Sequence, residues 1–259
     1  MPVREQVPQQ PTKADPYDSY SYSASLSRRL RNPGGFRSGT SGESPLRMNQ
    51  LIQVGDYELI DPAYYHEQAL RGNVLVMASQ IGDIIKQRVP LDSQEEKGSP
   101  ILDVAAGTGV VSGHLSDMGY EMTATDVSPR ALRYLKDHHP EITTKTADMN
   151  EKLPFDDNTF RGAATLWANR FVKGDIMPRE VYRVLAPGGV FIWPIDSQAE
   201  GAIWKKLAGT DQPTQPEELL KILESIGFSV DEVKAPEDDR FKNSRTIYPD
   251  IYLVASKPE

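Results

Sequence analysis

Residues 101–115 read ILDVAAGTGVVSGHL, and this stretch decides the fold class. An apolar run typical of a buried strand passes into a turn that contains Gly107 and Gly109, and then into a helix from about Val110. Glycines at such a turn avoid Cβ clashes, so a ligand can approach the backbone and the N–H groups at the start of the helix. The turn alone does not distinguish a dinucleotide-binding dehydrogenase from other classes of enzyme.

Beyond this stretch, short apolar strands alternate with helices along the chain. Such alternation implies parallel strands joined by helical crossovers, and therefore an α/β sandwich. The last two strands lie close together in the sequence, which favours an antiparallel hairpin at the sheet edge. Helices are expected to open at Asp61–Pro62, Ser128–Pro129, near Asp175 and near Pro216. The strands are expected at 101–105, 122–126, 142–147, 162–167, 190–195, 228–233 and 251–256.

The N-terminal segment differs in composition from the rest of the chain. Residues 1–47 are rich in Pro, Ser, Gly, Tyr and Arg, and they show no sustained apolar period. Such a segment cannot bury enough apolar surface to offset its ordering entropy, so we expect a flexible basic tail. Arg28, Arg29 and Arg31 are candidates to dock an acidic partner, whose identity is unknown, although such clusters are more often simply solvated.

Charge and composition exclude several classes of function. Residues 1–47 hold seven Lys/Arg and four Asp/Glu, so the net charge of −8 leaves −11 for residues 48–259. An acidic body repels phosphate backbones, so nucleic acid is not expected as a partner. No apolar run approaches the roughly 18 residues of a membrane helix, and no secretory signal is visible, so a soluble, cytoplasmic protein without membrane contact is expected. With no cysteine and four scattered histidines, no metal site is expected.

Carboxylates follow two of the expected strands. Asp126 ends the strand MTATD, and its carboxylate is suited to accept hydrogen bonds from both hydroxyls of a ribose, as in NAD or S-adenosylmethionine (SAM). Asp148 lies beyond the next strand, where a carboxylate can accept a hydrogen bond from the exocyclic amine of an adenine. The order of these residues favours a nucleoside cofactor at the strand ends.

Four stretches together resemble the successive motifs of class I SAM-dependent methyltransferases, most strongly from about Pro100 to Ile195. The resemblance implies a Rossmann-like three-layer sandwich with a mostly parallel seven-stranded sheet and an antiparallel C-terminal edge strand. It also implies a domain over 48–259 with an N-terminal helical lid at about 57–90, SAM as cofactor and methyl transfer to an acceptor. The four stretches are DVAAGTG (103–109), TDVSPRAL (125–132), ADMNEKLPFDDNTF (147–160) and EVYRVLAPGG (180–189).

The resemblance also implies roles for individual residues. Asp103 orders the glycine loop, Ala105 and Gly107 line the methionine moiety, and Asp126 holds the ribose. Apolar residues flank the adenine, Asp148 binds its amine, and the end of the fourth strand faces the sulfonium region. The full set implied is Asp103, Ala105, Gly107, Gly109, Asp126, Val127, Asp148, Met149 and Leu166.

The sequence departs from the family pattern at two places. Ala105–Ala106 replaces the Gly-Cys or Gly-Ser often seen there, and alanine is small enough to keep cofactor binding plausible. Arg161 stands where the family commonly has Asp, which leaves the packing at the start of that strand open.

The methyl acceptor is expected beyond the carboxyl ends of the strands, as ligands of open α/β sheets generally are. His66 is a candidate general base because it lies in the expected lid, with a packing histidine as the alternative. The expected pocket residues are the lid aromatics Tyr57, Tyr64 and Tyr65, then Trp167, Asn169 and Arg170 after the fourth strand, and Asp196 after the fifth.

Three functions remain open at this point. A small-molecule acceptor is favoured because the acidic body lacks a basic groove, while a protein acceptor and the element methylated stay open. A nicotinamide oxidoreductase would carry a Tyr-x-x-x-Lys relay or a comparable one, and no such tyrosine–lysine spacing occurs. A non-catalytic SAM-binding or interaction protein would bind SAM without turnover.

Overall fold

The computed structural model describes residues 61–71, 74–91, 100–195, 216–234 and 251–259. All of them lie in the second of the two units into which the chain divides, Ser44–Glu259. The predicted basic tail, Tyr57 and Asp196 therefore lie outside the described residues.

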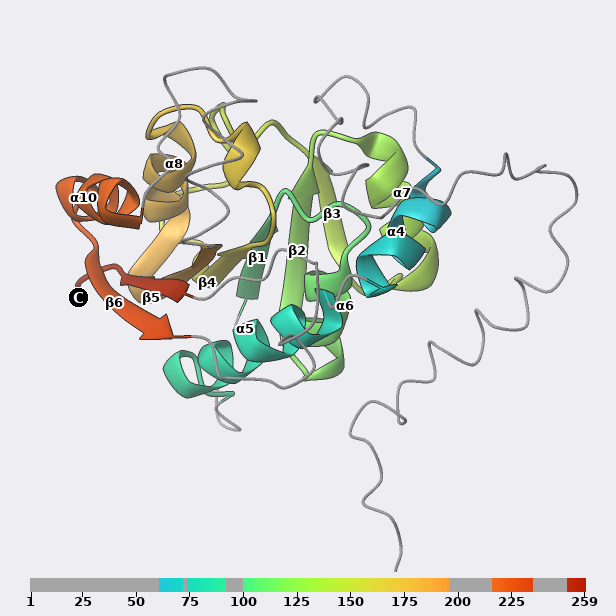
Figure 1. Cartoon of the computed structure of the whole chain (residues 1–259), viewed down its shortest axis with the longest axis horizontal. Helices are drawn as coiled ribbons and strands as arrows, with labels where there is room; N and C mark the ends of the chain where they lie inside the picture. Colours follow the sequence, from blue (N-terminus) through green and yellow to red (C-terminus); the bar gives the residue numbers. More distant parts are fainter. Residues whose placement is uncertain (1–60, 72–73, 92–99, 196–215, 235–250) are drawn as a thin grey trace, which may run out of the picture. The chain divides into compact units, whose positions relative to one another are not determined.

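Seven strands form one mixed sheet in the order β3-β2-β1-β4-β5-β7-β6 (Figure 1). Strands β1 to β5 run parallel to one another, whereas β7 is antiparallel to both β5 and β6. The strands are β1 (Pro100–Val104), β2 (Glu121–Asp126), β3 (Thr143–Thr146), β4 (Phe160–Thr165), β5 (Leu185–Ile195), β6 (Ser229–Lys234) and β7 (Ile251–Ser256).

Helices lie ahead of the first strand and in several of the connections between strands, and two of them begin at the capping residues that the sequence predicted. Asp61 Oδ1 accepts the N–H of Ala63 at 2.9 Å, and Ser128 Oγ accepts that of Ala131 at 3.2 Å, with Pro129 in the first helical position. The helices are α4 (Pro62–Arg71), α5 (Val74–Arg88), α6 (Val110–Asp117), α7 (Pro129–His138), η1 (Asn169–Phe171), α8 (Ile176–Val184) and α10 (Pro216–Ile226). None of the helices described here is long and apolar enough to cross a membrane.

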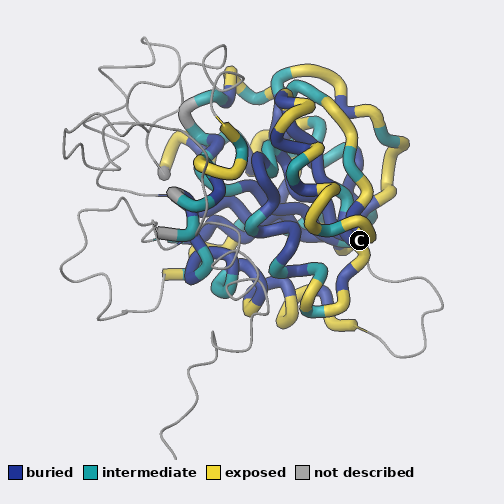
Figure 2. The backbone as a smooth tube through the Cα atoms, turned by 90° about the vertical axis from the view of Figure 1, so that its right-hand side faces the viewer, coloured by how far each residue is buried: buried dark blue, intermediate teal, exposed yellow. Residues whose placement is uncertain are grey.

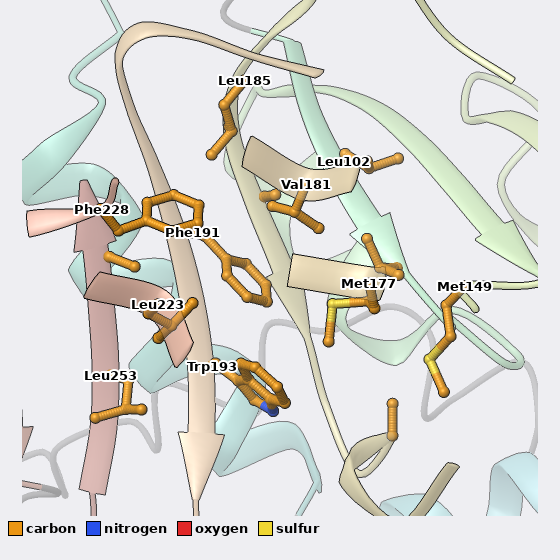
Figure 3. Close-up of a cluster of buried hydrophobic side chains, with 14 of the residues drawn as sticks. Leu102, Met149, Met177, Val181, Leu185, Phe191, Trp193, Leu223, Phe228 and Leu253 are labelled. Carbon is orange, nitrogen blue, oxygen red and sulfur yellow. The ribbon is translucent and has the colours of Figure 1, made fainter. Parts of the chain in front are cut away.

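The central strands of the sheet are buried on both faces, which confirms the predicted three-layer α/β sandwich. Successive residues of a strand point to opposite faces, so Ile101 packs with the cluster of α5, α6 and α7 while Leu102 packs with that of α8 and α10. Figure 3 shows the second cluster, where Phe191 and Trp193 of β5 meet Val181 of α8. In Figure 2 dark blue, buried segments fill the centre of the tube, whereas yellow, exposed segments gather on its outside.

The C-terminal edge of the sheet has the predicted antiparallel hairpin, with one refinement. β6 and β7 pair antiparallel, from Ser229 opposite Ser256 to Lys234 opposite Ile251. The last strand of the chain, β7, inserts between β5 and β6, so the outermost strand is β6. Arg161 lies where the pairing of β4 with β5 shifts register, and β4 pairs regularly with β1 from Gly162 onward.

Arg183 of α8 binds the segment 153–157, which follows β3, through several hydrogen bonds. Its guanidinium donates to the carboxylates of Glu180 and Asp157 at 2.6 and 2.7 Å, and to the carbonyls of Leu153 and Phe155 at 3.0 and 2.8 Å. A planar guanidinium with five donors can satisfy several acceptors at once. This network joins two of the stretches on which the family resemblance rests.

We predict that Gly109→Ala destabilises the protein by about 2–4 kcal/mol, measured by chemical denaturation. Gly109 has a φ of 81°, and an added Cβ would come within 2.3 Å of Leu135 Cδ1, so strain and overpacking combine. Gly174→Ala is the matched control, since its φ is 59° with nothing within 4 Å of the added Cβ, and we expect a loss of only about 1 kcal/mol. Equal losses in the two variants would contradict the packing argument.

Candidate functional site

One pocket opens at the carboxyl ends of β1, β2, β3 and β4. This is the edge of the sheet where the loops that follow parallel strands lie together. β4 lies beside β1 while β2 and β3 lie on the other side, so the pocket is at the point where the strand order reverses. Eight of the nine predicted cofactor residues line it: Asp103, Ala105, Gly107, Asp126, Val127, Asp148, Met149 and Leu166.

The turn after β1 is held by the end of β2. The Gly107 N–H donates to Asp126 Oδ2 at 2.8 Å, and the Ser128 N–H donates to Oδ1 of the same carboxylate at 2.9 Å. Because each oxygen accepts a backbone N–H, the Asp126 carboxylate, which is 6% exposed, is held in one orientation at the wall of the pocket. Ala105 adopts a left-handed φ of 57°, a conformation that glycine occupies without strain.

Gly109, the ninth predicted residue, does not line the pocket. It stands at the N-terminus of α6 and faces Leu135 of α7, so the structure places it in helix packing.

Asp103 is a buried carboxyl group beneath the glycine loop. It is 1% exposed, lines the pocket, and its Oδ2 accepts a hydrogen bond from Ser112 Oγ of α6 at 2.6 Å. Burial raises the pKa of Asp103 to about 7, against the opposing effect of the Ser112 hydrogen bond. The contact with α6 is consistent with the predicted role of ordering the loop.

The expected acceptor residues are placed unevenly around the pocket. Tyr65 and Trp167 line it, together with Ala69 of α4 and Val74 of α5. Tyr64 is 46% exposed and is not among the lining residues. The Arg170 side chain, like Tyr57 and Asp196, lies outside the described part of the chain.

His66 is buried next to the pocket but does not line it. Its Nδ1 lies 2.9 Å from Thr108 Oγ1 in the glycine loop, and its ring lies 5.2 Å from that of Tyr134. Burial, together with smaller contributions from the imidazoles of His138 and His139, lowers the pKa of His66 to about 4. The role of general base for His66 stays a prediction, and the direct contact of the side chain is with the loop.

Eleven of the residues that line the pocket were not among the predictions, and three of them, Asn150, Phe171 and Lys173, are joined by hydrogen bonds. The Asn150 side chain bonds to Asp148 and to the backbone of Phe171 and Lys173. The signal for Asn150 was its place in the stretch ADMNEKLPFDDNTF. Phe171 and Lys173 carry no local signal, because their position depends on the path of the chain after β4.

The sheet order and the pocket at the strand ends define a Rossmann-like α/β protein. Residues 101–189 match the family model described as a methyltransferase domain. A solved TehB-like SAM-dependent methyltransferase from Corynebacterium glutamicum has a similar fold, with a TM-score of 0.53 at 18% identity over 76% of this chain and 100% of that chain. Residues 101–189 are thus similar to methyltransferase domains, and the described residues share the fold of solved SAM-dependent methyltransferases.

Relatives of similar sequence have differing acceptors in their names. A demethylmenaquinone methyltransferase of Paenarthrobacter aurescens is 32% identical over 149 residues, covering 56% of this chain and 54% of that protein. A malonyl-[acyl-carrier protein] O-methyltransferase of Pectobacterium atrosepticum is 30% identical over 128 residues, 44% of this chain and 47% of that protein. An 18S rRNA (guanine-N(7))-methyltransferase of Bos taurus is 29% identical over 93 residues, 34% of this chain and 33% of that protein. The chain thus spans about half the length of the first two relatives and less of the third.

We predict that Asp103→Asn stabilises the ligand-free protein at pH 8 by about 1–3 kcal/mol, measured by urea unfolding. Since the folded pKa is raised to about 7 from 3.8, the folded state binds the proton more tightly, and wild-type stability falls as pH rises from about 4 to 7. The amide still accepts the Ser112 hydrogen bond but carries no charge. Asp137→Asn, exposed on α7, is the control and should leave stability unchanged. If Asp103→Asn instead destabilises the protein at pH 8, the conclusion that the buried carboxylate is unfavourable is wrong.

We predict the opposite pH dependence for His66. Its folded pKa of about 4 lies below the unfolded value of 6.5, so the unfolded chain takes up the proton first and stability falls as pH drops from 6.5 towards 4. His66→Gln removes this contribution, and the difference in unfolding free energy between pH 7.5 and pH 5 should be smaller in the variant than in wild type. An unchanged difference would contradict the burial of a neutral imidazole.

Proposed function

We propose that this chain transfers the methyl group of SAM to a small-molecule acceptor. The observation that carries the proposal is the convergence of eight predicted cofactor residues, from the ends of four strands, around one pocket. SAM supplies an activated methyl group on a cationic sulfonium. The task of the chain is to bind the cofactor, orient the acceptor and exclude water.

The chemistry of the pocket fits the cofactor part by part. Asp126, fixed by two backbone N–H groups, would hold the ribose diol, and Asp148 would accept the adenine amine. Val127 is 42% exposed at the pocket and Met149 is 8% exposed, and their apolar surfaces suit the adenine faces. Asp103 adds a buried carboxyl group, whose ionised form a cationic ligand would stabilise.

The acceptor would lie between the end of β4 and the N-terminal helices. Leu166 and Trp167 share a cluster with Ala69 and Val74, so helices α4 and α5 bring apolar side chains to this end of the pocket. We therefore propose that α4 and α5 form the lid that the sequence predicted over the pocket. An acceptor held here would contact mainly apolar surface and the half-buried Tyr65.

A small-molecule acceptor is favoured by charge and by two of the relatives. The net charge of −11 over residues 48–259 opposes phosphate backbones, and the two relatives with the larger overlaps are named for demethylmenaquinone and for a malonyl group on a carrier protein. The relative named for rRNA makes nucleic acid the alternative to test. The cytoplasmic location, the flexible tail and the absence of a metal site stay predictions.

The first test is calorimetric titration with SAM and S-adenosylhomocysteine. We expect saturable binding to wild type and at least about tenfold weaker binding to Asp126→Ala, because charge-assisted hydrogen bonds to the ribose are lost. Asp137→Ala, exposed on α7, is the matched control and should bind like wild type. Circular dichroism of all three proteins verifies folding.

The outcomes separate the functions considered. Absence of binding to folded wild type would refute the proposal, and binding of NAD instead would favour an oxidoreductase. Binding without methylation across quinol, acyl-carrier-protein and RNA acceptors would favour a non-catalytic SAM-binding protein.

A further inference from the structure

The side chain of Asn150 links two walls of the pocket. Asn150 Nδ2 donates to Asp148 Oδ1 at 3.1 Å and to the carbonyl of Phe171 at 2.9 Å, and Asn150 Oδ1 accepts the N–H of Lys173 at 2.7 Å. An amide group offers two donors and an acceptor, and all three functions are used here. The partners also fix which end of the amide is nitrogen, since a flipped amide would face two acceptors with its oxygen.

The two walls are not neighbours in the sheet. Asp148 follows β3, whereas Phe171 and Lys173 follow β4, and the strand order places β2 and β1 between β3 and β4. Three strand spacings amount to about 14 Å, so no ladder hydrogen bond can join these segments. Among the described contacts, Asn150 provides the hydrogen bonds between the two loops beyond the sheet edge.

Residues 166–173, here called the post-β4 segment, are held at a second point on the opposite side. The indole N–H of Trp193 donates to Asn169 Oδ1, and Asn169 Nδ2 donates to the carbonyl of Pro194 at 3.2 Å. Trp167, which precedes both points in the chain, has a left-handed φ of 60°. A bulky residue keeps such a conformation only when its surroundings impose it, and here these are the hydrogen-bonded segment that follows and the packing against Ala69 and Val74.

Asp148 uses one carboxylate oxygen for these contacts. Its Oδ1 accepts the backbone N–H of Asn150 at 2.8 Å as well as the side-chain amide, while Oδ2 has no protein partner among the described residues. Oδ2 is thus the atom that a ligand amine at this position would meet. A ligand that restrains Asp148 would restrain Asn150 through Oδ1, and through Asn150 the post-β4 segment.

We propose, on the basis of the proposed function, that Asn150 is a positioning residue that couples adenine binding at Asp148 to the order of the post-β4 segment. The cofactor then prepares the acceptor wall formed by Trp167 and Phe171 before the acceptor arrives. Coupling between two sites is reciprocal, so an acceptor that orders the post-β4 segment should also raise the affinity for the cofactor, and loss of the Asn150 bonds should remove this effect.

Hydrogen exchange measured by mass spectrometry tests the coupling without turnover. The Lys173 N–H, bonded to Asn150 Oδ1, is the reporter within a peptide covering the post-β4 segment. In wild type, saturating S-adenosylhomocysteine should slow exchange of this peptide by about tenfold. In Asn150→Ala, the same ligand at saturation should slow it by less than about twofold.

Two further variants isolate the role of Asn150. Asn150→Asp keeps an acceptor for the Lys173 N–H but can donate to neither Asp148 nor Phe171, so it should also lose the ligand-dependent slowing. Asn169→Ala is the matched control, because it frees the same segment from β5 while leaving the link to Asp148 in place. It should exchange faster in both states and still respond to the ligand.

The adenine amine is tested with S-inosylhomocysteine, which has a carbonyl oxygen in place of the amine. In wild type this analogue should bind at least about tenfold more weakly than S-adenosylhomocysteine and, at saturation, slow exchange by less than about twofold. Ligand-dependent slowing retained in Asn150→Ala, or lost equally in Asn169→Ala, would overturn the coupling while leaving the proposed function intact. Failure of wild type to bind S-adenosylhomocysteine at all would instead overturn both.

Discussion

The hydrogen bond from the Gly107 N–H to the Asp126 carboxylate is the contact on which the geometry of the pocket depends. It joins the turn after β1 to the end of β2 over 2.8 Å, and the second oxygen of Asp126 accepts the N–H of Ser128 at the start of α7. Hydrogen bonds to charged groups contribute about 1.5–3 kcal/mol each, and their loss would leave buried donors without an acceptor. One carboxylate therefore holds the glycine loop, binds the capping residue of α7 and lines the pocket.

The fold was predictable because its determinants are local. Apolar runs marked the strands, Asp61 and Ser128 marked helix starts, and the glycine turn of 107–109 marked the central crossover. Alternation of strands and helices then implied the layers. The insertion of β7 between β5 and β6 was not predictable in this way, because the pattern of a strand does not specify which edge it pairs with.

The site was predictable only where its residues follow directly from strand ends. Asp126 and Asp148 end or follow strands, so their meeting at one edge is a consequence of parallel pairing. Asn150 and Lys173 are 23 residues apart, and His66 and Thr108 are 42 apart, so their contacts depend on tertiary packing. The closeness of Gly109 to Leu135 depends on the same kind of packing, and a role for Gly109 in cofactor binding stays a prediction.

Backbone strain is concentrated at the pocket. Three non-glycine residues have a positive φ in the part of the chain described here, and two of them, Ala105 and Trp167, line the pocket. The third, Asn158, lies elsewhere, and asparagine tolerates this conformation better than most residues do. Each strained residue adjoins a fixed hydrogen bond: the Ala106 N–H donates to the Thr125 carbonyl at 2.8 Å, and Asn169 binds β5. Left-handed conformations cost about 1–2 kcal/mol per residue, so the rest of the fold must supply this energy. The buried carboxyl of Asp103 adds a further cost that a cationic ligand would offset. The strain at Ala105 and Trp167 persists because the surrounding structure holds it, whereas the unfavourable burial of the Asp103 carboxylate is the part that a cationic ligand can relieve on binding.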